Sequence, residues 1–336
     1  MAGRPRFDKS QIEAYFTRIA LPDHERKYSV SDLSDDEQLR FLQLLQRHHL
    51  VTVPFENLTL HYSWHRVVDV NPPHLFDKIV AERQGAGAGA GRGRGGYCME
   101  VNSLLHTLLL SLGFRVFMAG ARVYRAPTAS YGGFSHCVNI IRIGDGARYM
   151  VDVGFGANGP TVPLPLDVGR QHTQIAPADM RLVREPIPQN ADQECKLWIY
   201  QQRINARASW EPMYCFVDFE FILEDIRGMN LSPWKSPTSL FTQRVIVTRF
   251  TIKGEIEVEG AQNPRVKALE LQDEFDGTLI LDNNKLKWRR DGETVLEKQL
   301  ESEEERIAAL KKYFDIHLSH QDVEAIRGTC TQIKSQ

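Results

Sequence analysis

Apolar residues recur at helical spacing along the first third of the chain. Residues 34–37 read Ser-Asp-Asp-Glu, which is typical of a capping box at the start of a helix. The apolar positions that follow it with roughly helical recurrence are Leu39, Phe41, Leu42, Leu44 and Leu45. A shorter helix is expected over residues 10–19, and Pro54 ends the helical pattern because it disfavours helical geometry in the residue before it.

The clearest helical stripe starts near Cys98. Its apolar positions are Val101, Leu104, Leu105, Leu108 and Leu112. Gly113 follows directly and is a suitable C-terminal stop. Upstream of this helix, residues 85–93 form a Gly-Ala run that offers no packing surface, so a mobile insertion is predicted there.

After residue 114 the pattern changes to that of strands. Strands are predicted over residues 115–123, 136–143, 148–153, 196–204, 217–221 and 244–253, and in a late hairpin of 278–281 with 286–289. Asp145-Gly146 is a hairpin-turn signal between the second and third strands. A helical turn is expected over residues 225–230, and a second capping box at 302–305 precedes another helix. Helices, then strands, then a mixed end predict an α+β fold.

Composition narrows the class of protein. With 336 residues, 42% of them hydrophobic, the chain can bury a sizeable core and is not of the disordered type. A net charge of −2 gives no general attraction to nucleic acid or to an anionic membrane. The five cysteines are odd in number and contain no C-x-x-C pair, which argues against a disulfide framework or a zinc site. Since no signal peptide or transmembrane run is seen, a cytoplasmic protein is predicted.

Residues 94–102, Arg-Gly-Gly-Tyr-Cys-Met-Glu-Val-Asn, place Cys98 just before the strongest helix. Unpaired backbone N–H groups and the helix dipole at such a position favour the reactive thiolate. A nucleophilic cysteine needs a base, and the base needs a group that orients it. His136 and Asp152 are the candidates, because one would open a strand and the other would close its antiparallel hairpin partner.

The alternative interpretation is that Cys98 is a buried small hydrophobe, as most free cysteines are. On spacing alone this alternative is favoured. The neighbouring glycines favour a catalytic role for Cys98, since Gly95-Gly96 precede the cysteine and Gly154 and Gly156 follow Asp152. Glycine lets a ligand or another chain segment approach the backbone closely.

These motifs together resemble those of the arylamine N-acetyltransferase family, over most of the chain. The matching segments are Val-Pro-Phe-Glu-Asn-Leu at 53–58, the cysteine motif at 94–102, His136, Asp-Val-Gly-Phe-Gly at 152–156, Pro-Leu-Pro-Leu at 163–166, and residues 224–225, 229–230 and 236–242, which are similar to eukaryotic members. The Gly-Ala run is not part of the family pattern.

The resemblance implies an α+β fold in three regions. These are a helical bundle over residues 1–113 that carries the nucleophile, an antiparallel β-barrel over 114–225, and an α/β lid with the C-terminal segment over 226–336, around a cysteine-protease-like catalytic core. It also implies a ping-pong reaction, in which Cys98 takes an acyl group from acetyl-CoA or another acyl-CoA and passes it to an arylamine or arylhydrazine.

The resemblance also assigns roles to residues. Cys98, His136 and Asp152 are the implied catalytic triad. Polar residues implied to support the site are Glu56, Asn57, Arg94, Glu100 and Asn102. Implied walls of the acceptor pocket are Phe55, Tyr97 and Phe155. Implied contacts of coenzyme A are Gly132, Gly133, Gly154, Gly156, Ser236, Thr238 and Ser239.

Two other functions fit part of the pattern. A thiol hydrolase or peptidase would use the same triad in the same order. A binding protein that keeps only the pocket would have no use for an activated thiol. A metal is not expected, because His61 and His65 are four residues apart but lack a third ligand. The sequence leaves open whether the donor is acetyl-, propionyl- or malonyl-CoA, since pocket detail decides among them. The natural amine is equally open, and a monomer is expected.

Overall fold

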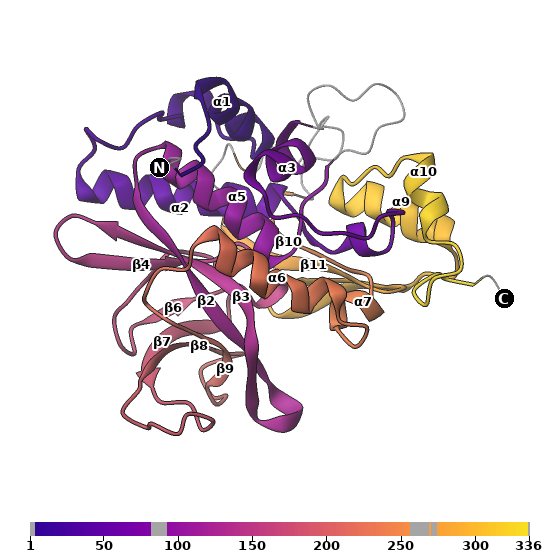
Figure 1. The fold of residues 1–336 in the computed structure, drawn as a ribbon. Coiled ribbons are helices and arrows are strands. Elements are labelled where there is room, and N and C mark those ends of the chain that lie inside the picture. Colours follow the sequence, from indigo (N-terminus) through magenta and orange to yellow (C-terminus); the bar gives the residue numbers. More distant parts are fainter. Residues whose placement is uncertain (1–3, 82–92, 256–268, 270–273, 335–336) are drawn as a thin grey trace.

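The computed structural model describes residues 4–81, 93–255, 269 and 274–334, so all but Gly93 of the predicted Gly-Ala insertion lies outside the described residues. The N-terminal helices gather on one side of the molecule, over a curled sheet, and a second sheet with the C-terminal helices lies beside them (Figure 1). The predicted mixture of helices and antiparallel strands is therefore confirmed.

The N-terminal region is helical, as its periodicity predicts. Its described α-helices are α1 (Lys9–Arg18), α2 (Asp35–Thr52), α3 (Pro72–Phe76) and α5 (Cys98–Ser111). Two short 3₁₀ helices, η1 (Asp23–Glu25) and η2 (Leu58–Leu60), and a π-helix, η3 (Asp77–Ala81), accompany them. The capping box at Ser34 and Glu37 is present in both directions. Gly113 follows α5 with a φ of 92°, which is the left-handed conformation that glycine provides at a helix end.

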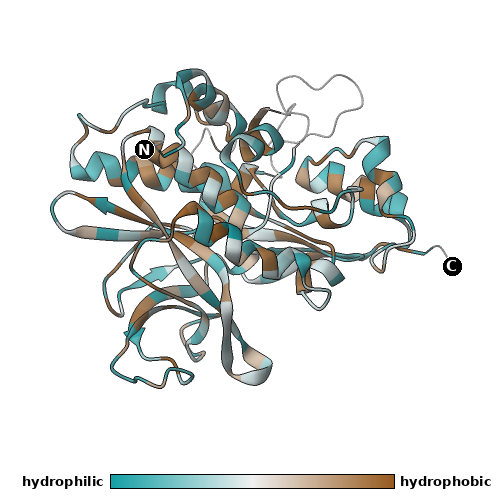
Figure 2. Ribbon diagram, in the orientation of Figure 1, coloured by the Kyte–Doolittle hydropathy of each residue, from teal (hydrophilic) through white to brown (hydrophobic). Residues whose placement is uncertain are grey.

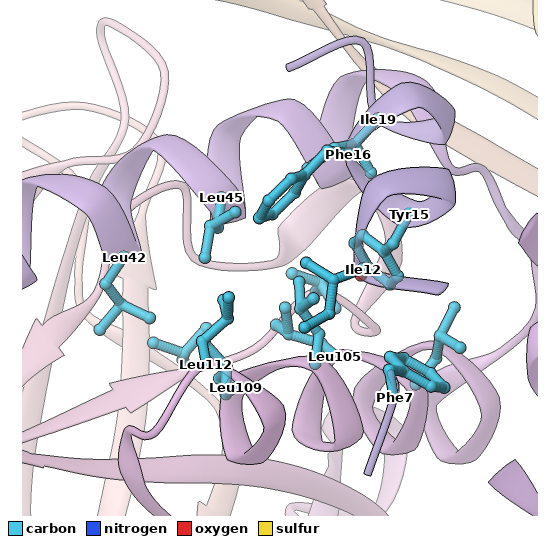
Figure 3. Packing of buried hydrophobic residues seen from close by; sticks show 14 of the residues in the cluster. Phe7, Ile12, Tyr15, Phe16, Ile19, Leu42, Leu45, Leu105, Leu109 and Leu112 are labelled. Atoms are coloured by element: carbon cyan, nitrogen blue, oxygen red, sulfur yellow. The ribbon is translucent and has the colours of Figure 1, made fainter. Parts of the chain in front are cut away.

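A hydrophobic core holds these helices together (Figure 3). Side chains from α1, α2 and α5 meet in one cluster, among them Ile12, Phe16, Leu42, Leu45, Leu105 and Leu109. In Figure 2 hydrophobic residues gather where the helices meet the sheets, whereas the outer faces of the helices are largely hydrophilic. This packing fixes α5, and with it the candidate nucleophile, in a rigid part of the fold.

The larger sheet has eight strands in the order β5-β4-β3-β2-β9-β8-β7-β6 and curls into a half-barrel. The strands are β2 (Arg115–Arg125), β3 (Ser130–Ile143), β4 (Ala147–Val151), β5 (Leu164–Pro165), β6 (Gln171–Thr173), β7 (Asp179–Glu185), β8 (Leu197–Arg203) and β9 (Glu211–Phe216).

Two predictions about this sheet need correction. His136 lies within β3 rather than at its start, because β3 begins at Ser130 in a long hairpin with β2. A strand is predicted over residues 217–221, but the observed strand, β9, ends just before them at Phe216. Within 217–221, Phe221 forms an isolated β-bridge with Met118. Asp152 directly follows β4, close to the predicted position at the end of that strand.

The second sheet has the order β1-β10-β11-β12-β13 and joins the two ends of the chain. Its strands are β1 (Phe55–Glu56), β10 (Ile246–Ile252), β11 (Phe275–Asp282), β12 (Lys285–Arg290) and β13 (Glu293–Gln299). The predicted late hairpin is confirmed as β11 and β12. β1 was not predicted, because two residues carry no periodicity. It brings the motif at 53–58 against β10.

The helices whose bounds the structure describes in the C-terminal half are α6 (Leu223–Lys235), α7 (Leu240–Gln243), α9 (Glu303–Phe314) and α10 (His320–Ala325). At α9 only half of the predicted capping box forms: Ser302 accepts from the backbone N–H of Glu305, but the Glu305 carboxylate accepts from Glu301. In the described part of the chain, no helix has the length and apolar character needed to cross a membrane.

Candidate active site

Cys98 is the first residue of α5 and is almost fully buried, with 3% of its surface exposed. Its Sγ atom lies 3.6 Å from the carbonyl oxygen of Ser135 on β3. The side chain therefore sits between the positive end of a helix and the strand that carries His136.

His136 and Asp152 form a buried pair. Nε2 of His136 lies 2.7 Å from Oδ2 of Asp152. Burial lowers the pKa of His136, but the charge and hydrogen bond of Asp152 and a hydrogen bond with Cys98 outweigh it and raise this pKa to about 10. Burial raises the pKa of Asp152, and the interaction with His136 outweighs it and lowers that pKa overall. This arrangement favours a charged imidazolium between a carboxylate and the thiol sulfur.

Asn102, one turn along α5 from Cys98, holds the aspartate. Its Nδ2 donates to Oδ1 of Asp152 at 2.9 Å and to the Cys137 carbonyl at 2.8 Å. Its Oδ1 accepts from the backbone N–H of Val153 at 3.0 Å. The Asn102 side chain thus connects α5 to β3, which carries His136, and to the segment after β4, which carries Asp152. The resemblance implies such a supporting role for Asn102.

Aromatic rings pack around the imidazole. The ring of His136 has Phe155 at 5.1 Å and Tyr214 at 4.8 Å between ring centroids. These contacts restrict rotation of the imidazole and exclude water from the His136–Asp152 pair. The sequence analysis did not identify Tyr214, because nothing in the sequence around it indicates that β9 places this ring against His136 on β3.

A buried ion network underlies the start of α5. Glu56 accepts from Nε of Arg94 at 3.0 Å and from the backbone N–H of Leu58 at 2.6 Å. Nζ of Lys78 lies 2.7 Å from Oε1 of Glu100, whose other oxygen accepts from the N–H of Tyr97. Burial raises the pKa of Glu56, but Arg94 and Lys78 outweigh it and lower this pKa to about 2.

Glu56, Arg94 and Glu100, which are expected to support the site, belong to this network, and Lys78 is a member that the sequence did not reveal. Lys78 lies in η3, outside every recognisable motif. Burial raises the pKa of Glu100, with Lys78 opposing that effect. The two cations therefore balance two carboxylates beneath the nucleophile.

We expect Glu56→Gln to lower the free energy of unfolding by about 3–5 kcal/mol, because it leaves buried cations without their counter-charge. Chemical denaturation of the parent and the variant measures the change. Glu293→Gln is a matched control at an exposed position on β13, where an effect within about 0.5 kcal/mol is expected. Equal stability of the Glu56→Gln variant and the parent would contradict this account of the network.

The glycines around the triad face other parts of the same chain. A methyl group on Gly95 would lie 1.8 Å from the carbonyl oxygen of Pro54, and one on Gly154 would lie 2.6 Å from Cα of Cys98. Glycine is needed at both positions so that the cysteine motif can approach β1 and the Asp152 segment can approach α5. Of the two approaches expected at these glycines, that of another chain segment is observed at Gly95 and Gly154.

A cavity of about 720 Å³ opens onto Cys98 and His136. Predicted site residues on its wall are Phe55, Gly154, Phe155, Gly156, Ser236, Thr238 and Ser239. The structure thus brings together segments from β1, the turn after β4, and the connection from α6 to α7. Arg125, at the end of β2, also lines the cavity and was not predicted.

Three predicted pocket or coenzyme contacts lie elsewhere among the described residues. Tyr97 is fully buried, donates its hydroxyl to Oδ1 of Asn230, and is not on the cavity wall. It therefore supports the site from behind instead of lining the pocket. Gly132 and Gly133 lie in the β2–β3 hairpin, also off the wall, and Gly132 packs against Arg125.

Asn57 and His61 join the motif at 53–58 to the C-terminal half. Nδ2 of Asn57 donates to the carbonyls of Phe241 and Arg244, at 2.8 and 2.7 Å. His61 is buried with a ring nitrogen 3.0 Å from the Phe241 carbonyl, whereas His65 is exposed and neither lies on a helix. Within the described ranges no three His, Cys, Asp or Glu residues cluster as metal ligands would.

The fold and the site define the class of protein. It is an α+β protein in which a buried cysteine and histidine line one cavity and a buried aspartate binds the histidine, as in thiol-dependent transferases and hydrolases. A family model described as N-acetyltransferase matches residues 38–274. The chain is 31% identical over 349 residues to the N-malonyltransferase FDB2 of Gibberella moniliformis, covering 97% of this chain and 93% of that protein. It is 30% identical over 241 residues to human arylamine N-acetyltransferase 1, covering 69% and 75%.

Solved structures share the fold. The arylamine N-acetyltransferase from Salmonella typhimurium superposes with a TM-score of 0.73 at 23% identity, covering 95% of this chain and 98% of that one. The Mycobacterium marinum enzyme, solved in complex with CoA, gives 0.69 at 24% identity, covering 95% and 99%. The chain belongs to the arylamine N-acetyltransferase family, and its class is that of the acyltransferases.

Proposed function

We propose that this protein transfers a short acyl group from coenzyme A to an arylamine or arylhydrazine through a thioester on Cys98. The observation that carries the proposal is that Cys98 and His136, the latter bound to Asp152, line a cavity large enough for a small aromatic ligand. The proposal includes the three-region organisation expected from the sequence, with a cysteine-protease-like catalytic core.

In the first half-reaction, Nδ1 of His136 takes the thiol proton, because Nε2 is occupied by Asp152. The Cys98 sulfur attacks the thioester carbonyl carbon of the donor, and backbone N–H groups at the start of α5 stabilise the negative oxygen of the tetrahedral intermediate. The intermediate collapses as its bond to the coenzyme sulfur breaks. Coenzyme A leaves as a thiol with the proton from His136, so one thioester replaces another.

In the second half-reaction, the amine nitrogen attacks the Cys98 thioester. His136 accepts the proton that the amine loses, and the sulfur leaves as the thiolate. Phe55 and Phe155 on the cavity wall favour an aromatic acceptor. The names of the relatives, an N-malonyltransferase and arylamine N-acetyltransferases, support an acyl-CoA donor of two or three carbons. The Ser236, Thr238 and Ser239 hydroxyls are candidates for contact with the coenzyme.

Intact-protein mass spectrometry tests both halves. The protein is incubated briefly with acetyl-CoA, or with malonyl-CoA, in the absence of amine. One acyl group per chain is expected, and adding aniline should remove it and yield the N-acylated product. Steady release of coenzyme A without an adduct or an amide would point to a hydrolase instead. Neither adduct nor release with any short acyl-CoA would point to a binding protein.

A further inference from the structure

Arg125 is the sole lysine, arginine, aspartate or glutamate among the described residues that line the cavity containing Cys98 and His136. Its guanidinium makes no hydrogen bond or ion pair with another described residue. A guanidinium carries five donors in a planar fork that matches a carboxylate. Because no other lysine or arginine and no carboxylate lies on the described cavity wall, Arg125 is placed to bind an anionic group on a ligand.

The side chain of Arg125 folds back along the hairpin toward the triad. Ala121 on β2 pairs with His136, and the β-bulge that contains Gly132 lies beside Val123, two residues farther along β2. A methyl group on Gly132 would lie 3.3 Å from Nη2 of Arg125. The guanidinium therefore lies near the level of Val123, although its own Cα is two residues beyond.

This placement sets a distance from the reacting centre. A strand advances about 3.3 Å per residue, so the guanidinium lies about 7 Å along β2 from the level of His136. In a malonyl thioester, the free carboxylate carbon lies two carbon–carbon bonds from the carbonyl carbon that Cys98 attacks. A charge-assisted hydrogen bond from the carboxylate to the guanidinium adds about 2.8 Å. The two lengths together are comparable with that separation. An acetyl group ends at its methyl carbon and cannot make this contact.

We propose that Arg125 binds the free carboxylate of a malonyl-type donor and makes the protein prefer that donor to acetyl-CoA. The proposal rests on acyl transfer through Cys98 and adds to it the residue that selects the acyl group. The carboxylate keeps its charge throughout, because the bond that forms joins the Cys98 sulfur to the thioester carbonyl carbon and the bond that breaks joins that carbon to the coenzyme sulfur. Arg125 acts by binding the donor and takes no proton.

The test measures the rate of Cys98 acylation, as kcat/KM for coenzyme A release with saturating amine, for three donors. These are malonyl-CoA, acetyl-CoA and butyryl-CoA, the last having an acyl chain of similar length without the charge. Arg125→Gln is expected to lower kcat/KM with malonyl-CoA by about 10- to 100-fold, since a hydrogen-bonded charge pair is lost. The values with acetyl-CoA and butyryl-CoA should change less than about twofold.

Two further variants sharpen the test. Arg125→Lys keeps the charge but not the bidentate fork, so its loss with malonyl-CoA should be smaller than that of Arg125→Gln. Arg142→Gln removes the same charge from an exposed position at the far end of β3 and should leave all three donors unchanged.

Different results overturn the proposal in distinguishable ways. Equal losses with all three donors would place Arg125 on the phosphates of coenzyme A, which every donor shares. No loss with malonyl-CoA, or a parent protein that accepts acetyl but not malonyl groups, would also reject it while leaving transfer through Cys98 in place. If the parent accepts no acyl group from any donor, the proposed function fails first, and the inference with it.

Discussion

Cys98→Ala is expected to abolish acyl transfer, with a fall of about 10⁵-fold or more in kcat, because Cys98 is the only thiol among the described residues that line the cavity and the proposed thioester forms on it. The change removes one buried sulfur and leaves the backbone of α5 intact. Mass spectrometry after incubation with acetyl-CoA or malonyl-CoA should show no adduct on the variant and one adduct on the parent.

The neighbouring Cys137 does not substitute for Cys98. Burial, reinforced by the charges of Cys98 and Asp152, raises the pKa of the Cys137 thiol well above its usual value, so it stays protonated. Its Sγ donates to the Cys98 carbonyl at 3.6 Å, within the core. Strand alternation, which directs residues next to His136 away from it, explains this orientation.

Cys215→Ala provides the matched control, since Cys215 is also buried but lies on β9 outside the triad. This variant should acquire the adduct at the parent rate, and both variants should remain folded by circular dichroism. An adduct that persists on Cys98→Ala, and that peptide mapping assigns to another residue, would show that the nucleophile has been misidentified.

The sequence predicted the elements whose periodicity is long and the motifs whose chemistry is local. α2 and α5 were predicted correctly because each repeats its apolar stripe over several turns between recognisable ends. The β11–β12 hairpin was predicted from two short strand-like runs, at 278–281 and 286–289. The sequence did not predict β1 or the correct bounds of β9, because the formation of both strands depends on pairing with strands distant in the sequence.

The same division applies to the site. Cys98, His136 and Asp152 were identifiable because their types and flanking glycines match a chemical requirement, and the structure places the latter two in hydrogen-bond contact. Lys78 and Arg125 were not identifiable, since a lysine or arginine in a polar stretch is ordinarily solvated. Only the fold shows that one is buried against Glu100 and that the other lines the cavity.

Asp152→Asn is expected to lower the rate of Cys98 acylation by about 10³- to 10⁴-fold at neutral pH. The charge of Asp152 is what overcomes the effect of burial on His136 and raises its pKa to about 10. With a neutral amide in its place, burial dominates, and the imidazolium that should pair with the thiolate is no longer stabilised. The amide can also donate to Nε2, which would put the ring proton on Nδ1 and remove the base. Rapid-quench measurement of the acyl adduct checks the loss, and Asp167→Asn, an exposed position after β5, is the control.

The same substitution should change how stability depends on pH. The lowered pKa of Asp152 contributes stability above its unfolded value of about 3.9, and this contribution is lost as the pH falls. The raised pKa of His136 contributes stability that is complete below its unfolded value of about 6.5 and is lost as the pH rises toward about 10. The difference in unfolding free energy between parent and Asp152→Asn should therefore be largest between about pH 4 and 6.5 and shrink on both sides. If the difference stays the same as the pH falls below about 4 and rises above about 6.5, the pair is not charged in the folded protein and Asp152 only orients a neutral imidazole.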